Sequence, residues 1–352
     1  MDVILHVGDI SYANGNPEVR ACWCVVLVQD VVGCASPRYH GCQKVAACWT
    51  SLPPQQQIWD TFMHMIEPAS RQVPYMVTVG NHEYCYSNKH HEGADPSGAD
   101  EPFSPDWGNY GNDSGGECGV PFSKRFEMPA KGAPEDTNAL DEDDWDEPPA
   151  NRKPPQDNAP FWYAFDYGSV HFVSISTEHD LARKSKQHRW LKAHLARVDR
   201  CRTPWLVVLM HRPMYVVFPH KSNRIVADHL RNQLEDLFEH AKVDLVLSGH
   251  VHDYARTCNV LDKRCVHERD GGMSHITVGT AGHKLSDVER EQADWLEHAE
   301  MAFGYARLHV EGSQRLKFEF VATEDGKVLD YMVLENKRVE GRNCPSAYAA
   351  EA

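Results

Sequence analysis

Six side chains of the types that bind metal ions follow apolar runs at four places in the chain. The runs are residues 3–7, 75–79, 205–210 and 243–248, and the side chains that follow them are Asp9 and Tyr12, Asn81, His211, and His250 and His252. Carboxylate, amide oxygen, phenolate and imidazole groups together suit a pair of hard or borderline metals such as Fe, Zn or Mn. One histidine at such a position is usually a core or surface residue, but four stretches of one design predict a two-metal site.

The spacing of His250 and His252 is compatible with either one ion or two. Residues two apart share a face in an extended segment, whereas in a tight loop their side chains diverge and can serve two adjacent ions.

The elements that must position these side chains are parallel strands. Apolar, β-branched-rich runs are typical of buried strands, and α/β folds place their chemistry at the carboxyl ends of such strands. Helical spacing predicts an amphipathic helix from Gln55 that ends at Pro68, and further helices at 185–198 and 226–241. Antiparallel strands are predicted at 161–167, 170–176, 274–280, 303–310, 315–322 and 328–334. The predicted fold is α/β, a layered sandwich of sheets with helices outside.

Composition narrows the class of protein. The chain has 352 residues and a formal net charge of -15, which argues against a nucleic-acid or anionic-membrane surface as partner. An acidic protein that handles phosphate needs local positive charge, and metal ions would supply it. No run of about 20 apolar residues is present, and the amino terminus does not resemble a signal peptide.

The cysteines leave the cellular compartment open. Five of the 11 lie between Cys22 and Cys48, and the other six form an even number, as in secreted or vacuolar proteins with disulfides. Cys258 and Cys265 flank a predicted hairpin and form the best local pair. The triplet that begins at Asn112 is a glycosylation acceptor and would support a secretory route. A cytosolic protein with free thiols is the alternative.

Four sequence blocks resemble signature blocks of the purple acid phosphatases, the tyrosine-containing branch of the metallophosphoesterases. They are Gly8-Asp9-Ile10-Ser11-Tyr12, Gly80-Asn81-His82-Glu83, Val208-Leu209-Met210-His211 and Gly249-His250-Val251-His252. The resemblance continues, in order, through 112–119, 161–163 and 303–305. It implies a metallophosphoesterase β-sandwich of two mixed sheets flanked by helices.

The resemblance also implies an activity, hydrolysis of phosphate monoesters by a hydroxide shared between Fe(III) and a divalent metal. Asp9 would bridge the metals, Tyr12 and His252 would complete the iron side, and Tyr12 would give the purple colour. Asn81, His211 and His250 would hold Zn, Mn or Fe. The predicted substrate-binding residues are Asn81, His82, His220 and Lys221, with His82 and His220 as the catalytic candidates. A secreted or vacuolar location follows by the same resemblance, and the oligomeric state is not indicated.

Two departures from the family bear on this interpretation. The family's first block, a strand that ends in an aspartate, lies upstream of Asp9, and Asp2 cannot replace it because seven strand residues separate them by roughly 23 Å. The predicted iron side therefore lacks a carboxylate, and the sheet lacks a central strand and its helix. We hypothesise that Met1 is an internal or mispredicted start. Residues 20–54 are surplus, and resemble translated intron or a cap over the site.

The predicted organisation is a catalytic domain at 1–300, strands at 301–336 that complete it, and a tail at 337–352. An acidic, proline-rich loop at 134–158 lacks the ligand spacing of a calcium site. Two other functions stay open. One is a phosphodiesterase or nucleotide pyrophosphatase on the same metals, and the other is a non-catalytic remnant, which the missing aspartate favours.

Overall fold

The computed structural model describes residues 2–12, 25–30, 54–84, 97–98, 119–130, 157–217, 221–267, 270–286 and 290–336, with the backbone alone at 25–30, 54–56 and 221–222. Its helices are α1 (Pro54–Ser70), α2 (Val120–Arg125), α3 (Lys186–Leu195) and α4 (Lys221–Ala241). Its strands are β1 (Val3–Val7), β2 (Val25–Asp30), β3 (Tyr75–Thr78), β4 (Tyr163–Tyr167), β5 (Val170–Ile175), β6 (Trp205–Met210), β7 (Leu245–Ser248), β8 (Tyr254–Thr257), β9 (Val260–Leu261), β10 (Arg264–Cys265), β11 (Ser274–Val278), β12 (Leu296–Glu300), β13 (Gly304–Glu311), β14 (Arg315–Ala322) and β15 (Val328–Glu335).

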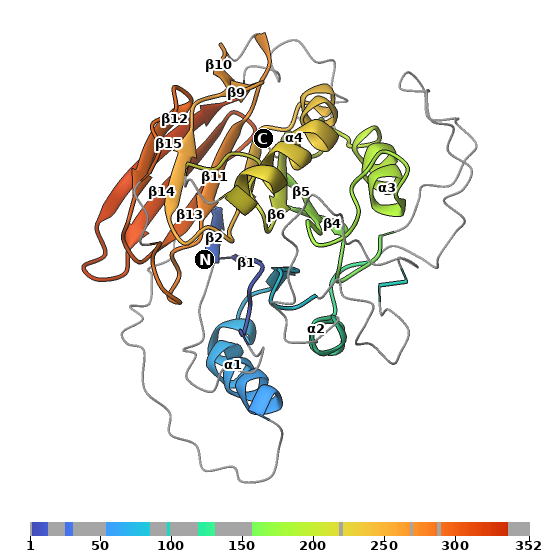
Figure 1. Ribbon diagram of the computed structural model, residues 1–352, viewed down its shortest axis with the longest axis vertical. Helices are drawn as coiled ribbons and strands as arrows, with labels where there is room; N and C mark the ends of the chain where they lie inside the picture. The colour runs from blue at the N-terminus through green and yellow to red at the C-terminus, as the bar shows by residue number, and fades with distance from the viewer. Residues whose placement is uncertain are drawn as a thin grey trace.

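Two mixed sheets form the centre of the molecule (Figure 1). The first has the strand order β15-β14-β13-β2-β1-β3, and the second has the order β12-β8-β11-β7-β6-β5-β4. Within the first sheet β1 is parallel to β3. Within the second, β5, β6, β7 and β11 are mutually parallel. This arrangement confirms the predicted fold class.

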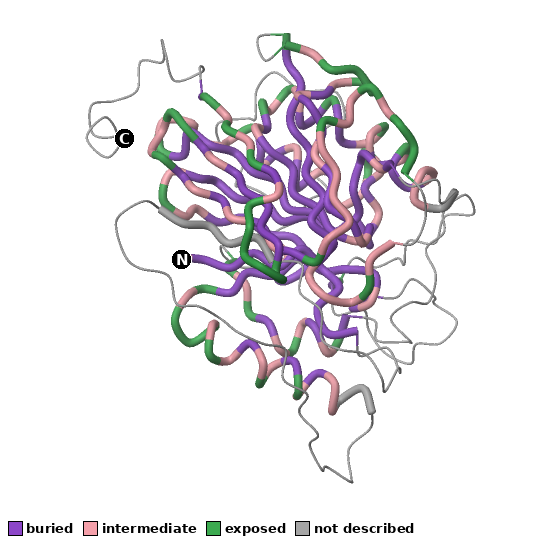
Figure 2. The backbone as a smooth tube through the Cα atoms, turned by 90° about the vertical axis from the view of Figure 1, so that its left-hand side faces the viewer, coloured by how far each residue is buried: buried purple, intermediate pink, exposed green. Residues whose placement is uncertain are grey.

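The strands alternate between two hydrophobic layers, because successive side chains of a strand point to opposite faces. Val3, Leu5 and Val7 of β1 lie in the core shared by the two sheets, where Phe318 and Phe320 of β14 also pack. Figure 2 shows this buried centre, with exposed backbone mainly at the outer turns and helices. The inter-sheet core fixes the position of one sheet against the other.

Helices cover the outer faces of both sheets. Ile4 of β1 belongs to the same core cluster as Trp59 and Phe62 of α1, so α1 covers the outer face of the first sheet. Trp190 of α3 and Leu234 of α4 join this cluster from the helices beside the second sheet (Figure 1). Helix α1 continues through Pro68, two residues past its predicted end, because the missing N–H affects only its last turn.

Part of the predicted insert at 20–54 contributes a strand. Strand β2 lies between β1, to which it is antiparallel, and β13, to which it is parallel. The run Val25-Val26-Leu27-Val28 is the sequence signal that could have indicated it. Helix α2 and strands β8 and β12 were not predicted either. Most of the insert and of the acidic loop, and the whole tail at 337–352, lie outside the described residues.

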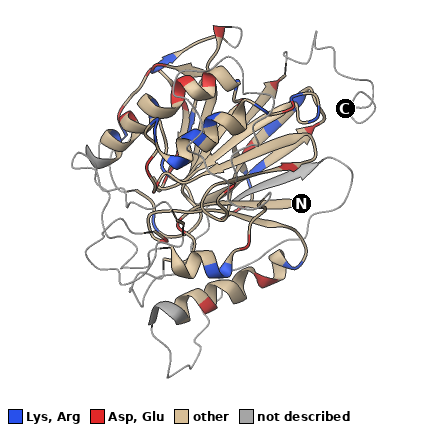
Figure 3. Ribbon diagram, turned by 90° about the vertical axis from the view of Figure 1, so that its right-hand side faces the viewer, with Lys and Arg blue, Asp and Glu red and all other residues tan. Residues whose placement is uncertain are grey.

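No described helix is both long and apolar enough to span a membrane. Acidic and basic residues are interspersed along the helices (Figure 3).

Candidate metal centre

Four polar atoms from four loops converge where β1, β3, β6 and β7 end. Asn81 Oδ1 lies 2.8 Å from His211 Nε2 and 2.9 Å from His250 Nδ1. The two ring nitrogens are 3.2 Å apart, and His211 Nε2 is also 3.2 Å from Asp9 Oδ1. The Asp9, His211 and His250 donor atoms all lie within 4.8 Å of one another. One cation could be reached by all four side chains.

The other oxygen of Asp9 faces a second group. The Tyr12 hydroxyl donates to Asp9 Oδ2 at 3.2 Å and lies 3.1 Å from His252 Nε2. Asp9 therefore stands between an Asn81-His211-His250 half and a Tyr12-His252 half. The six predicted side chains thus come together, and their arrangement divides as the family resemblance implies.

Three of these six residues have left-handed backbones, with φ of 53° at Asp9, 52° at Tyr12 and 64° at His250. Such conformations are uncommon for residues other than glycine and cluster at functional sites. Gly8, at φ 86°, lies against His211, and a side chain there would overlap the imidazole. The loops are folded to aim the polar side chains inward.

Glu83 fastens the loop after β1 to the loop after β3. Its buried carboxylate accepts hydrogen bonds from the backbone N–H groups of Asp9 at 2.9 Å, Ile10 at 2.7 Å and Gly80 at 3.0 Å. Burial and the negative charge of Asp9 raise the pKa of Glu83 to about 8, against the effect of these donors. Sequence analysis assigned Glu83 no role, although it directly follows His82.

The protonation of the cluster suits metal binding. Burial lowers the pKa of His250 well below its ordinary value, and the Arg212 charge adds to this. Burial likewise lowers the pKa of His252 to about 4. Burial alone would raise the pKa of Asp9, but neighbouring His211 holds it well below its usual range. Neutral imidazoles and an ionised carboxylate are the forms that coordinate metals.

The pKa of His211 shifts in the opposite direction. Its burial opposes protonation, but the Asp9 charge outweighs this and raises the pKa of His211. Its Nδ1 donates to the carbonyl oxygen of Val7 at 2.9 Å, which leaves Nε2 as the atom that faces the cluster. A hydrogen bond from the far nitrogen to a carbonyl is a common support of a metal-binding histidine.

Two further imidazoles flank the Tyr12 ring. The His82 ring centroid lies 4.3 Å away, and the His82 backbone N–H donates to Asp9 Oδ1 at 3.2 Å. His283, which was not predicted, stacks on Tyr12 at 4.4 Å with an interplanar angle of 10°. His82 thus lies beside the centre, and its role in substrate binding stays a prediction.

The structure describes only some of the remaining predicted residues. His220 and Asn112 lie outside the described residues, and Lys221 is described only as the first residue of α4. Cys258 and Cys265 form a disulfide beside the β9–β10 hairpin. Arg212 and Asn223, which contact His250, were not identified from the sequence.

The donor set fits a pair of metals. Two imidazole nitrogens, an amide oxygen and a carboxylate oxygen meet at one half, and a phenol and an imidazole meet the other carboxylate oxygen. Neighbouring nitrogen and oxygen atoms of the first half lie 2.8 to 3.2 Å apart, close enough to share one cation. Nitrogen and oxygen ligands of this mixture suit Zn, Mn or Fe.

Comparison with known proteins agrees with this geometry. Residues 1–254 match the model of the calcineurin-like phosphoesterases, and the chain belongs to this family of metal-dependent phosphoesterases. Residues 272–331 match the model described as iron/zinc purple acid phosphatase-like protein C. Within the family the chain is therefore purple acid phosphatase-like, which confirms the resemblance found in the sequence.

Individual relatives are plant proteins. An Arabidopsis thaliana protein named probable inactive purple acid phosphatase 9 is 35% identical over 93% of this chain and 42% of its own length. A Hordeum vulgare nucleotide pyrophosphatase/phosphodiesterase is 26% identical over 97% of this chain and 74% of its own. The structure of a purple acid phosphatase from yellow lupin, Lupinus luteus, superposes with a TM-score of 0.64 at 26% identity, covering 95% of this chain and 46% of that one. The chain thus spans less than half the length of several relatives.

Proposed function

We propose that this protein is an acid phosphatase that hydrolyses phosphate monoesters at a centre of Fe(III) and one divalent metal. The observation that carries the proposal is the position of Asp9, whose two carboxylate oxygens face two different sets of metal-binding side chains.

Each half of the centre has its own role in the proposal. Tyr12 and His252, with Asp9 Oδ2, would hold Fe(III), and a phenolate ligand would give a visible absorption band. Asn81, His211 and His250, with Asp9 Oδ1, would hold Zn, Mn or Fe in the divalent state. When bound, the metals would supply positive charge to the phosphoryl group and an acidified water as nucleophile.

The substrate would be a small phosphate ester that lies beside His82. In this proposal the imidazole, which is half-buried and next to Tyr12, would donate a hydrogen bond to a phosphoryl oxygen. His220 and Lys221 are proposed to contact the phosphate or the leaving alcohol from the start of α4. An acidic optimum, a secreted or vacuolar location and glycosylation at Asn112 are part of the same proposal.

Two other functions are supported by the relatives. The barley protein favours a phosphodiesterase or nucleotide pyrophosphatase on the same centre, since it matches nearly the whole chain. The Arabidopsis protein named as probably inactive favours a non-catalytic role.

Metal content, the visible spectrum and hydrolysis, measured on one preparation, discriminate among these functions. We expect about two metals per chain, a tyrosinate band, and hydrolysis of p-nitrophenyl phosphate that exceeds that of bis-p-nitrophenyl phosphate. The matched control is Asp9→Asn, which keeps the shape of the side chain and removes its charge. Faster hydrolysis of the diester would favour the second function. A metal-loaded protein without activity on either ester would favour the third.

A further inference from the structure

The inner nitrogen of His250 belongs to the metal centre, and the outer nitrogen lies in a separate polar environment. His250 Nδ1 faces Asn81 Oδ1 and His211 Nε2, so a bound metal requires an unprotonated Nδ1. A neutral imidazole carries one proton, and that proton must then be on Nε2. The partner of Nε2 therefore decides whether Nδ1 is ready to bind metal.

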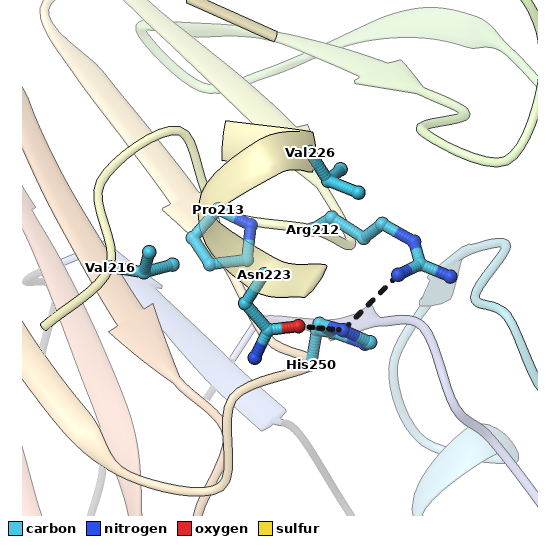
Figure 4. A pocket seen from close by; sticks show the side chains of 6 residues that line it. All are labelled: Arg212, Pro213, Val216, Asn223, Val226 and His250. Atoms are coloured by element: carbon cyan, nitrogen blue, oxygen red, sulfur yellow. Dashed lines mark hydrogen bonds between the residues drawn. The ribbon is translucent and has the colours of Figure 1, made fainter. Parts of the chain in front are cut away.

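Nε2 has two partners of opposite kind, both at 3.3 Å. One is Asn223 Oδ1, which can only accept a hydrogen bond, and the other is Arg212 Nη1, which can only donate one. Figure 4 shows both side chains directed at the His250 ring from opposite sides. Because the two distances are equal, distance alone favours neither partner.

Both partners are held in place by the fold. Arg212 directly follows His211, and Glu178 binds its Nε at 2.8 Å and its Nη2 at 3.1 Å, so Nη1 is the atom left to face His250. Glu178 and Arg212 are almost fully buried, which limits rotation of the guanidinium. Asn223 lies in the first turn of α4, whose position is set by the core cluster through Leu230 and Leu234.

We propose that Asn223 and Arg212 are positioning residues that select between the two neutral tautomers of His250. With the proton on Nε2, His250 donates to Asn223, and Nδ1 is free for the metal. With the proton on Nδ1, His250 donates to Asn81 Oδ1, and Nε2 accepts from Arg212. On metal binding one proton leaves Nδ1 for water and one is taken up at Nε2, so the charge of His250 is unchanged.

The two residues therefore have opposite effects on metal affinity. Asn223 favours the tautomer with the proton on Nε2, which can bind metal. Arg212 favours the tautomer with the proton on Nδ1, which donates to Asn81 instead. Removing a hydrogen-bond partner of a metal-binding histidine typically costs 10- to 100-fold in affinity. This inference rests on the proposed function in one respect, that His250 binds a metal through Nδ1.

The test is Zn²⁺ binding to the full chain, measured by competition with a chromophoric chelator. Asn223→Leu, which has no acceptor, should weaken binding at one of the two sites about 10- to 100-fold. Asn223→Asp keeps the acceptor in the same place and should restore affinity close to that of the wild type. Arg212→Met combined with Glu178→Gln removes the competing donor without leaving a buried carboxylate unpaired, and it should bind Zn²⁺ at least as tightly as the wild type.

Histidine ¹⁵N–¹H correlation spectra supply a readout that a general structural defect would not reproduce. The His250 proton should be on Nδ1 in the metal-free wild type and on Nε2 after Zn²⁺ is added. Equal affinity of wild type and Asn223→Leu within about threefold, or one unchanged tautomer in both states, would overturn the inference. If the wild type binds no Zn²⁺ at all, the proposed function fails first, and every variant will show the same absence of binding.

Discussion

Replacing Gly80 by alanine should disable the metal centre with little effect on the rest of the fold. Gly80 immediately precedes Asn81, and its backbone passes beside Asp9. A Cβ at this position would lie 2.4 Å from the Asp9 backbone nitrogen, 2.5 Å from Asp9 Oδ1 and 3.0 Å from Glu83 Oε2. Gly80 does not have a positive φ, so the penalty is purely steric.

The size of the effect follows from the required displacement. Ordinary contact with a Cβ begins near 3.4 Å, so the Asp9 backbone nitrogen must retreat by about 1.0 Å and Asp9 Oδ1 by about 0.9 Å. Metal–ligand distances tolerate only about 0.2 Å, and Asp9 lies between both halves of the centre. Overpacking of this kind costs about 1–3 kcal/mol, which corresponds to a loss of about 5- to 150-fold in metal affinity.

Chelator competition with Zn²⁺ measures this loss, and urea denaturation of the metal-free protein measures any general destabilisation. Gly326→Ala is the matched control, because no atom lies within 4 Å of a Cβ there, although its φ of 74° carries its own strain. We expect Gly326→Ala to lower stability slightly and to bind Zn²⁺ normally. Wild-type affinity in Gly80→Ala, within about threefold, would refute the steric argument.

Three further predictions concern the link between the sheets, the colour and the disulfide. Asp330 on β15 accepts from Arg256 Nε on β8 at 2.7 Å and from the Tyr254 hydroxyl at 2.7 Å. Arg256 keeps Glu297 as a partner, so Asp330→Ala should cost about 1–3 kcal/mol in urea unfolding by leaving these buried donors without their acceptor. Burial alone would raise the pKa of Asp330, but its hydrogen-bond partners lower it. The stabilisation is therefore present above about pH 3.8 and is lost as the pH falls further. A stability difference between wild type and variant that stays constant down to about pH 2 would contradict this. Tyr12→Phe should abolish the visible band of the Fe(III)-loaded protein while Zn²⁺ still binds at the Asn81 half, and a retained band would show that another ligand produces it. Reduction of the Cys258–Cys265 bond, which spans seven residues, should lower stability by about 2–3 kcal/mol on the loop-entropy model, and an unchanged urea midpoint would show that the bond contributes nothing.

Much of the centre could be predicted from the sequence because each proposed ligand lies in the loop that follows a strand. An apolar run and the polar residue after it are local features, and parallel strands bring their carboxyl ends together in any such fold. His250 could therefore be assigned from its own stretch. Asn223 could not, because its contact with His250 depends on where α4 begins relative to β7, which starts at Leu245 on the far side of the helix in sequence.

Strand β2 shows a second limit of prediction. Its apolar run is typical of a buried strand, yet the cysteine-rich surroundings and the comparison with family blocks favoured an insert. Pairing with β1 and β13 is a long-range property that neither composition nor spacing reveals. The same holds for Glu83, because two of its three hydrogen bonds connect two loops that are more than 70 residues apart in sequence.

The metal centre lies across the boundary between the two sheets. For this reason we expect the affinity for metal ions and the stability of the fold to respond to different substitutions. Asp9 and Asn81 follow strands of the first sheet, whereas His211 and His250 follow strands of the second. The inter-sheet core packs the two layers directly against each other. Close contacts at Gly8 and Gly80 then determine how closely the ligand-bearing loops approach one another. A substitution at these glycines changes the distances between ligands, while the buried strands beneath them keep their packing.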